Sequence, residues 1–463
     1  MILFDSVQKK KCQFVPKEKN KVYIYLCGPT VYDDAHLGHA RSSVCFDLLQ
    51  RVLIANDYEV IFTRNYTDID DKILKKMQES KKSLEEITNF YIQSYENDMQ
   101  ALNILEPNYK PKATAYIKEM IDYIQNLLDK DFAYKLDDGI YFDTSKDKKY
   151  FCISNRNLED TKSRLEENNT KKNPSDFVLW KFDEKFYPAI FGTGRPGWHT
   201  ECVVMIESIY KDKLDIHAGG MDLLFPHHEN EASQCRCKNN YELANFWLHN
   251  GFVQINGEKM SKSLDNSFFL KDSLKIFCAE AIRFYLLSSH YRANFNYSLE
   301  DLKSSKKRLD KFYRLKKRLN LNAFDDLKPK FKNPITKSII EALNDDLNSS
   351  KALALMDEFI NECNNYLDKN PKDKTYKDLS SEILHELGFI FGIGKIDTIK
   401  YFQFGISKEE CEKIEKQIIL RNEAKQAKNY TLADQIRDDL AKENILLMDT
   451  PNGVVWEKNE QKL

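Results

Sequence analysis

The chain has 463 residues, of which 42% are hydrophobic and 31% are charged, with a formal net charge of −2. This mixture excludes a disordered chain and is typical of folded domains with substantial cores. No apolar run approaches the roughly 20 residues of a transmembrane helix, and charged residues follow the N-terminus too soon for a signal peptide. We therefore expect a cytoplasmic protein without membrane contact. The near-neutral net charge gives no sign of nucleic-acid binding by the chain as a whole.

The first informative stretch runs from Val22 to Asp47. Val22–Leu26 is a short apolar run that predicts a buried strand, a loop rich in turn residues follows it, and helical periodicity begins at Leu37. His36 and His39 stand at this helix start. Helix starts attract anions through unpaired N–H groups and the helix dipole, so the stretch predicts a nucleotide site. The alternative is a pair of ordinary surface histidines.

A second predicted strand, Val60–Thr63, follows the first helix. A strand, a helix and a second strand in this order are typical of a parallel Rossmann-like unit. The acidic residues Asp68, Asp70 and Asp71 favour a helix start over a magnesium site, because carboxylates offset the helix dipole there. Beyond them the patterns predict two helices and then two short strands: Ser83–Leu102 and Ala113–Lys130, then Gly139–Asp143 and Tyr150–Ile153.

Two later stretches carry residue types that bind metals. A segment rich in glycine precedes Cys202 at a predicted helix start. Farther on, His227 and Glu231 are four residues apart and share one helix face, whereas His228 is expected to point to a different side. Together with Cys27 they offer two sulfurs, a nitrogen and an oxygen, a donor set suited to tetrahedral zinc. The alternative is a set of unrelated core residues, since the ten cysteines are scattered and form no C-x-x-C pair.

A lysine-bearing loop comes next. Lys259 and Lys262 belong to the run KMSKS, which follows a predicted strand, Phe252–Ile255, and a tight-turn signal, Asn256-Gly257. Lysines on such a loop can move onto the phosphates of a bound nucleotide.

The segment Lys303–Arg318 is densely basic and carries an apolar stripe of Leu309, Phe312 and Leu315. As a helix it would bury the stripe and present a cationic face suited to phosphates. The alternative is a solvated surface helix. Later patterns predict a helix bundle and then a small unit that ends in a hairpin: Ile339–Leu347, Ala352–Tyr366, Ile383–Phe391, Lys408–Lys425, Tyr430–Lys442, Ile445–Met448 and Val454–Trp456.

Two of these motifs occur together in a known family. His36-Leu37-Gly38-His39 and Lys259–Ser263 resemble the HIGH and KMSKS signatures of class I aminoacyl-tRNA synthetases, with Leu37 in place of isoleucine as the only departure. The runs YLCGPTVYDDAHLGHAR, RNYTDIDDK, GRPGWHTEC and FPHHENEASQ resemble the cysteinyl-tRNA synthetase family in particular, and with the C-terminal segment they cover nearly the whole chain.

The resemblance implies roles for residues at the matching positions. Cys27, Cys202, His227 and Glu231 would hold one zinc ion per chain. Such an ion would separate cysteine from serine, a choice that an apolar pocket makes poorly. The remaining assignments are catalytic His36, His39, Lys259 and Lys262; ATP-binding His36, Gly38, His39, Gly220, Asp222 and Lys262; and substrate-binding Cys27, Thr67 and Trp198.

The resemblance also implies the reaction and its partners. L-Cysteine would be activated with ATP and Mg²⁺ to cysteinyl-adenylate and then transferred to the 3′-terminal adenosine of tRNA(Cys), and the chain would be a monomer. In the C-terminal unit Arg437, Asp449 and Trp456 are candidate anticodon readers, since unpaired RNA bases are recognised by stacking and edge contacts. Trp456 is equally compatible with a core position.

The expected architecture is an α/β Rossmann-like catalytic domain with an inserted domain, followed by a helix bundle and a small mixed α/β C-terminal domain. The expected segments are the first catalytic half, the insertion, the second catalytic half, the KMSKS-bearing stem-contact region, the bundle and the C-terminal unit: 1–112, 113–190, 191–235, 236–300, 301–400 and 401–463. Two other functions stay open: an ATP-dependent ligase that joins cysteine to an aminosugar, which would lack the C-terminal unit, and a non-catalytic tRNA-binding paralog, which would have lost signature residues.

Overall fold

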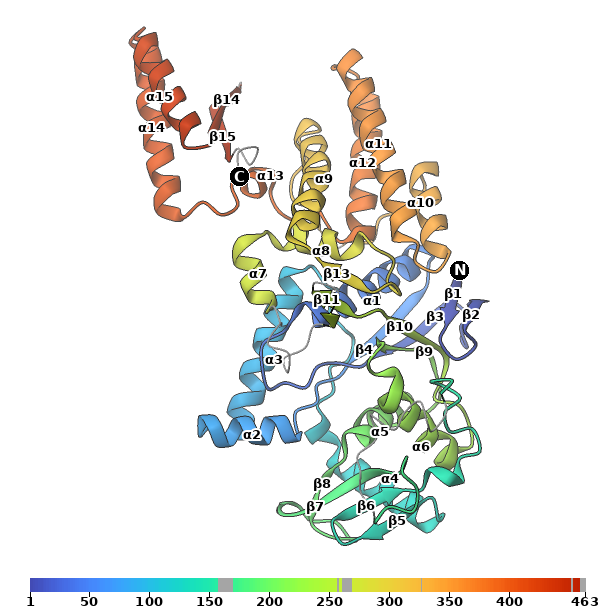
Figure 1. The fold of residues 1–463 in the computed structure, drawn as a ribbon. Helices are drawn as coiled ribbons and strands as arrows, with labels where there is room; N and C mark the ends of the chain where they lie inside the picture. Colours follow the sequence, from blue (N-terminus) through green and yellow to red (C-terminus); the bar gives the residue numbers. More distant parts are fainter. Residues whose placement is uncertain (157–169, 256–257, 260–268, 326, 451–452, 459–463) are drawn as a thin grey trace.

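The computed structural model describes residues 1–156, 170–255, 258–259, 269–325, 327–450 and 453–458. At its centre lies a parallel sheet in the order β10-β9-β3-β4 (Figure 1). Its strands are β3 (Lys21–Leu26), β4 (Glu59–Arg64), β9 (Leu214–Gly220) and β10 (Ala244–Asn250). The helices around it are α1 (Leu37–Ala55), α2 (Asp71–Ser80), α3 (Leu84–Ala101), α5 (Trp198–Tyr210), η4 (Leu224–His228) and α6 (Glu229–Asn239). This arrangement confirms the predicted Rossmann-like unit.

The strand order reverses at β3, which pairs with β4 on one side and with β9 on the other. Ligands of such sheets bind beyond the carboxyl ends of the strands at this reversal point. Asp70 is the N-cap of α2 and accepts a hydrogen bond from the backbone N–H of Lys72 at 2.8 Å, as the helix-start interpretation predicts. A short hairpin of β1 (Ile2–Asp5) and β2 (Lys10–Gln13) is attached to the sheet, because the Asp5 carboxylate accepts a hydrogen bond from the backbone N–H of Trp247 in β10.

A second unit lies at the far side of the sheet from the bundle (Figure 1). It is an antiparallel sheet in the order β5-β6-β7-β8 with helix α4 packed beside it. Its elements are η1 (Ala113–Tyr116), α4 (Ile117–Asp129), β5 (Ala133–Leu136), β6 (Gly139–Phe142), η2 (Thr144–Lys146), β7 (Phe177–Tyr187) and β8 (Gly194–Pro196).

Three local predictions fail here. Tyr150–Ile153 is a run of turns and not a strand. The boundary at 190 is too early because β8 pairs with β7, and the boundary at 235 is too early because β10 pairs with β9 in the catalytic sheet. The boundary at 190 followed from the family resemblance, and neither boundary could take account of which strands pair.

The segment expected to be the stem-contact region is built around a small sheet in the order β12-β11-β13. Its elements are β11 (Val253–Ile255), β12 (Glu258–Lys259), α7 (Leu270–Ile276), α8 (Ala279–Leu287) and β13 (Phe295–Tyr297). The predicted turn at 256–257, Lys262 and the side chain of Lys259 lie outside the described residues.

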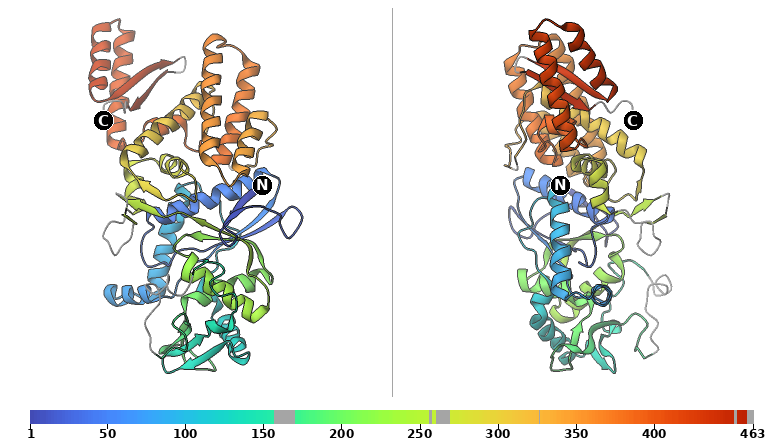
Figure 2. Two further views of the ribbon diagram at one scale, coloured as in Figure 1. Left: turned by 45° about the vertical axis from the view of Figure 1, so that its right-hand side comes forward. Right: turned by 90° about the vertical axis from the view of Figure 1, so that its left-hand side faces the viewer.

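The remaining elements form a helix bundle and a separate C-terminal unit (Figure 2). They are α9 (Leu299–Arg318), α10 (Pro334–Asn344), α11 (Ser349–Lys369), α12 (Lys374–Phe391), α13 (Thr398–Phe402), α14 (Lys408–Gln426), α15 (Tyr430–Lys442), β14 (Ile445–Thr450) and β15 (Gly453–Lys458). The predicted stripe of Leu309, Phe312 and Leu315 is buried along α9, and β14 and β15 form the predicted antiparallel hairpin. Among the described residues, none of the helices has the length and apolar character needed to cross a membrane.

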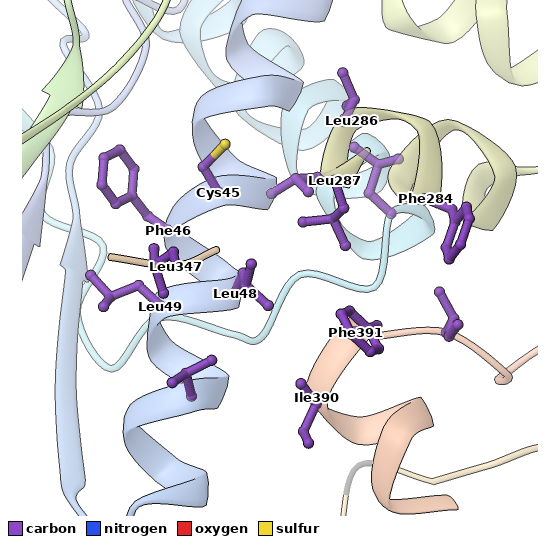
Figure 3. Close-up of a cluster of buried hydrophobic side chains, with 14 of the residues drawn as sticks. Cys45, Phe46, Leu48, Leu49, Phe284, Leu286, Leu287, Leu347, Ile390 and Phe391 are labelled. Carbon is purple, nitrogen blue, oxygen red and sulfur yellow. The ribbon is translucent and has the colours of Figure 1, made fainter. Parts of the chain in front are cut away.

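Catalytic unit and bundle share one core. Figure 3 shows side chains of α1, α8 and α12 converging, among them Phe46, Leu49, Phe284 and Phe391. The amino end of α1 carries the two signature histidines, and the other end is packed against the bundle. The helix therefore has a fixed position relative to both.

Candidate active site

The site lies where strands β3, β4 and β9 end. Cys27 directly follows β3, and its backbone N–H donates to the carbonyl of Ala218 in β9 at 3.1 Å. At Gly28 a Cβ atom would stand 1.7 Å from the carbonyl oxygen of Asn65, so only glycine permits this approach of the two loops. The loop after β3 is thereby held against the loop after β4, which carries Thr67.

The structure brings together the four predicted metal ligands from three separate segments: the end of β3, α5 and the continuous stretch of η4 and α6. Cys27 Sγ lies 3.8 Å from Cys202 Sγ and 3.9 Å from Glu231 Oε1, and His227 Nε2 lies 2.6 Å from the same carboxylate oxygen. All four donor atoms lie within 4.8 Å of one another. Cys202, His227 and Glu231 are buried, and Cys27 is half-buried. Two thiols, an imidazole and a carboxylate at such spacing fit a zinc ion.

A second group of donors shares Cys27 and Glu231 with the first. His228 Nε2 lies 3.4 Å from Cys27 Sγ, while His217 Nε2 lies 2.7 Å from Glu231 Oε2. Cys27, His217, His228 and Glu231 therefore also meet the spacing for one metal ion. His227 and His228, which lie in the π-helical turn of residues 224–228, belong to different groups.

Opposite charges meet in the cluster. A hydrogen bond from Cys27 lowers the pKa of the Cys202 thiol to about 6. Burial works against a charged imidazole at His227, but the neighbouring Glu231 carboxylate outweighs it and raises the His227 pKa to about 10. Burial likewise opposes ionisation of Glu231, yet His227 and His217 hold its pKa well below the usual value. These electron-pair donors need protons or a metal ion between them.

Further histidines surround the cluster, and the sequence analysis gave none of them a role. His199 Nδ1 lies 3.0 Å from His227 Nδ1, His228 Nδ1 lies 2.8 Å from His249 Nε2, and His249 Nδ1 lies 2.8 Å from the Ser6 hydroxyl. Such contacts fix the orientation of ligand imidazoles. The crowding of histidines between residues 199 and 249 was the signal available in the sequence.

Trp198 and Thr67 frame the cluster. Trp198 stacks on His227 with ring centroids 4.2 Å apart and is 37% exposed, so it covers the imidazole from the solvent side. The Thr67 hydroxyl donates to Glu201 Oε2 at 2.9 Å, and both side chains are buried. Burial raises the pKa of Glu201. Sequence reasoning missed Glu201, although it precedes Cys202 in the quoted GWHTEC run.

The signature histidines cap α1. His36 Nδ1 accepts from the backbone N–H groups of Gly38 at 3.1 Å and His39 at 3.3 Å, and the two imidazole rings stack 3.8 Å apart. Phe269, the first described residue after the KMSKS run, forms a β-bridge with His36. Phe269 is therefore held beside the helix start.

Gly220 ends β9 beside an exposed acid. A Cβ at Gly220 would stand 2.4 Å from Asp222 Oδ1, so the residue keeps the strand end open to that carboxylate. Asp222 is exposed at the carboxyl edge of the sheet, where a nucleotide ribose binds in Rossmann-like folds.

The C-terminal unit separates its three candidate readers. Arg437 and Asp449 are exposed, and Asp449 pairs with Arg421 at 2.9 Å. Trp456 is only 2% exposed and its Nε1–H donates to Glu415 at 2.7 Å. Its assignment as a base reader is therefore wrong and the core alternative is right, because a buried ring offers no face to an anticodon base.

Comparisons with known proteins agree with this arrangement. Residues 13–307 match the family described as "tRNA synthetases class I (C) catalytic domain", and residues 338–395 match the "DALR domain". Cysteine–tRNA ligase of Campylobacter lari is 78% identical over 99% of this chain and 100% of its own length. The enzyme of Campylobacter hominis is 58% identical over 99% of this chain and 98% of its own length.

Solved structures show the fold at low identity. Methionyl-tRNA synthetase of Mycobacterium tuberculosis, in complex with methionyl-adenylate, matches with a TM-score of 0.55 and 12% identity over 80% of this chain and 88% of its own. LeuRS of Agrobacterium radiobacter, in a ternary complex with tRNA, matches with a TM-score of 0.57 and 11% identity over 82% of this chain and 85% of its own.

Proposed function

The chain belongs to the cysteine–tRNA ligase family of class I aminoacyl-tRNA synthetases, and from this premise we propose how its residues carry out the reaction. Its function is to activate L-cysteine with ATP and to attach it to tRNA(Cys). The observation that carries the detailed proposal is the meeting of Cys27, Cys202, His227 and Glu231 beyond the ends of β3 and β9.

In the first step the cysteine carboxylate attacks the α-phosphorus of ATP and pyrophosphate leaves. Such a transfer needs positioning and charge neutralisation more than covalent help. His36 and His39 at the positive end of α1, together with Lys259 and Lys262, meet the phosphates, with Mg²⁺ bound to ATP. Gly38 admits the phosphates to the helix start, and Gly220 and Asp222 hold the ribose.

In the second step a terminal ribose hydroxyl of the tRNA attacks the adenylate, and AMP leaves. Membership in class I implies the 2′-hydroxyl. The cysteinyl group then stands on the 3′-terminal adenosine.

The substrate side chain lies against the metal cluster. A zinc ion held by Cys27, Cys202, His227 and Glu231 would supply a thiophilic position that favours the thiolate of cysteine over the hydroxyl of serine. The protein's own contribution is to hold these four donors at fixed positions. Trp198 excludes water over His227, and Thr67, oriented by Glu201, hydrogen-bonds the substrate's polar groups.

The bundle and the C-terminal unit bind the anticodon side of the tRNA, where Arg437 and Asp449 present polar groups to unpaired bases. We place the enzyme in the cytoplasm, because its family acts in translation. We take it to be a monomer, as the family resemblance implies. The aminosugar ligase is not favoured, since the full-length match to cysteine–tRNA ligases includes the C-terminal segment that the ligase would lack.

A charging assay tests the proposal. Labelled cysteine, ATP and total tRNA are incubated with the enzyme, and serine serves as the control amino acid. We expect labelled tRNA with cysteine only. Cysteine-dependent ATP–pyrophosphate exchange without charging would favour the aminosugar ligase, and absence of both activities would favour the non-catalytic paralog.

A further inference from the structure

Helix α9 carries nine basic side chains in its 20 residues, and most of them have partners within the protein. Lys306 pairs with Asp310 and Arg308 with Asp357. Near the end of the helix, Arg314 and Lys317 both reach the buried Glu457 of β15, and Arg318 pairs with Asp368. Lys316 donates to the carbonyls of Gly394 and Ile396. These basic groups therefore serve the architecture of the bundle.

Three lysines differ from the rest. Lys303, Lys307 and Lys311 are exposed, and within the described part of the chain no ion pair or hydrogen bond is made by their ammonium groups. They follow one another at intervals of four residues and so form one row along a single face of α9, called here the lysine row. Like charges at this spacing destabilise a helix. The repulsion between the lysines of such a row is offset when an anion from outside the protein binds over it.

A polar pocket of about 350 Å³ lies on another part of α9. Asp301, Ser304 and Arg308 line it from α9, and none of the three lysines contributes to its lining. Because the pocket holds a carboxylate and Arg308 is already paired with Asp357, it is not counted as part of the phosphate-binding surface.

The position of α9 fits a tRNA as the anion over the row. It packs on α8 of the stem-contact region, and its far end is bound to β15 of the C-terminal unit through Glu457. Figures 1 and 2 show it between the catalytic sheet and the C-terminal unit. A tRNA with its 3′ end at the sheet and its anticodon at the C-terminal unit passes along this part of the molecule. The row spans about 12 Å of helix, enough to meet several phosphates of one strand.

We propose that the lysine row binds the sugar–phosphate backbone of the bound tRNA between its two ends. This inference rests on the proposed function, because it takes tRNA as the partner. The row contributes affinity and orientation but no base selection, since phosphates are the same at every position.

The test compares two variants with the same change in charge. The row variant carries Lys303→Gln, Lys307→Gln and Lys311→Gln. The control carries Lys9→Gln, Lys10→Gln and Lys19→Gln, three exposed lysines of the N-terminal segment, outside the bundle. Binding of total tRNA is measured over a range of salt concentrations. ATP–pyrophosphate exchange without tRNA and the melting temperature serve as checks on the catalytic site and the fold.

For the row variant we expect binding about tenfold weaker than wild type and a log–log salt slope reduced by about 2 to 3, because each phosphate contact contributes about one unit. Exchange and melting should stay unchanged, and the control should bind like wild type. An unchanged affinity and slope in the row variant would overturn the proposal, as would an equal loss in the control. Failure of the wild type to charge tRNA would instead overturn the proposed function, because the row is judged by binding alone.

Discussion

Two buried polar clusters among the described residues can be compared, and only one of the two has the character of a site. In the first, Asp47 of α1 is paired with Arg51 and Arg283, all fully buried. The arginines also donate to the carbonyls of Phe389 at 2.9 Å and Phe391 at 2.6 Å, at the end of α12. This cluster is satisfied by the protein itself and joins the catalytic helix to the bundle.

The second cluster is different in kind. The donor atoms of Cys27, Cys202, His227 and Glu231 converge on one position. The hydroxyl of Tyr25, which is fully buried, has no hydrogen-bond partner among the described residues. Unpaired buried donors and converging ligand atoms are costly unless something binds between them. The comparison teaches that burial and charge alone do not mark a site, whereas convergence of ligand atoms from separate segments does.

The largest effect is expected from breaking the structural cluster. Arg283→Met removes one of the two arginine partners of Asp47 and the hydrogen bond to the carbonyl of Phe391. The loss should be about 3–5 kcal/mol of unfolding free energy, as for other broken buried pairs. Urea denaturation measures it, and the exposed Lys337→Met on α10 is the control, expected to change little. A loss near that of the control would refute a structural role for the cluster.

Removal of the metal ion from the second cluster is expected to affect catalytic activity, whereas breaking the first cluster affects stability. Dialysis against a chelator should lower cysteine-dependent ATP–pyrophosphate exchange by about a hundredfold or more, because the thiol-selecting position is lost. Zinc should restore the activity. Full exchange by a preparation shown to be free of zinc, with Mg²⁺ supplied, would contradict the account.

A lone buried carboxyl sharpens the comparison further. Asp98 has an oxygen without a hydrogen-bond partner among the described residues, and burial, followed by the charge of Asp34, raises its pKa to about 6. Between about pH 4 and 6 the folded state holds a proton that the unfolded state has lost. Wild-type stability should therefore fall by about 1–2 kcal/mol as pH rises through this window, allowing for partial solvent access.

The variant Asp98→Asn should lack this decline and be the more stable protein at pH 7. Denaturation midpoints of both proteins at pH 4 and pH 7 decide the matter. Parallel pH profiles would show that Asp98 does not carry the penalty.

The smallest effect concerns the corrected C-terminal residue. Trp456→Phe removes the hydrogen bond to Glu415 and should cost about 1 kcal/mol of stability, with the KM for tRNA(Cys) unchanged within about twofold. Arg437→Ala is the counterpart: a severalfold higher KM and an unchanged melting temperature. A large rise in KM for Trp456→Phe at full stability would restore its role as a reader.

Local sequence patterns predicted the catalytic strands and helices well, because apolar periodicity and capping residues act within a few residues. The helix beginning at Leu37 and the hairpin that contains Trp456 are examples. Strand pairing is a long-range property, so β8 and β10 were assigned to the wrong segments.

The site was predictable to a lesser degree. Residue types alone left Cys27, Cys202, His227 and Glu231 as one of many combinations, and the family resemblance was needed to select them. The second group, with His217 and His228, went unnoticed because its members come from separate elements. Trp456 is buried because it packs against α14, and local sequence patterns do not reveal such a long-range contact.

The most direct test of the account is the zinc content of four proteins, measured by mass spectrometry: wild type, Cys202→Ala, His227→Ala and His228→Ala. The account predicts one zinc per chain in the wild type, most of it retained in His228→Ala and nearly all lost in Cys202→Ala and His227→Ala. Retention in Cys202→Ala and His227→Ala with loss in His228→Ala would assign the metal to Cys27, His217, His228 and Glu231, and would contradict the proposed ligand set.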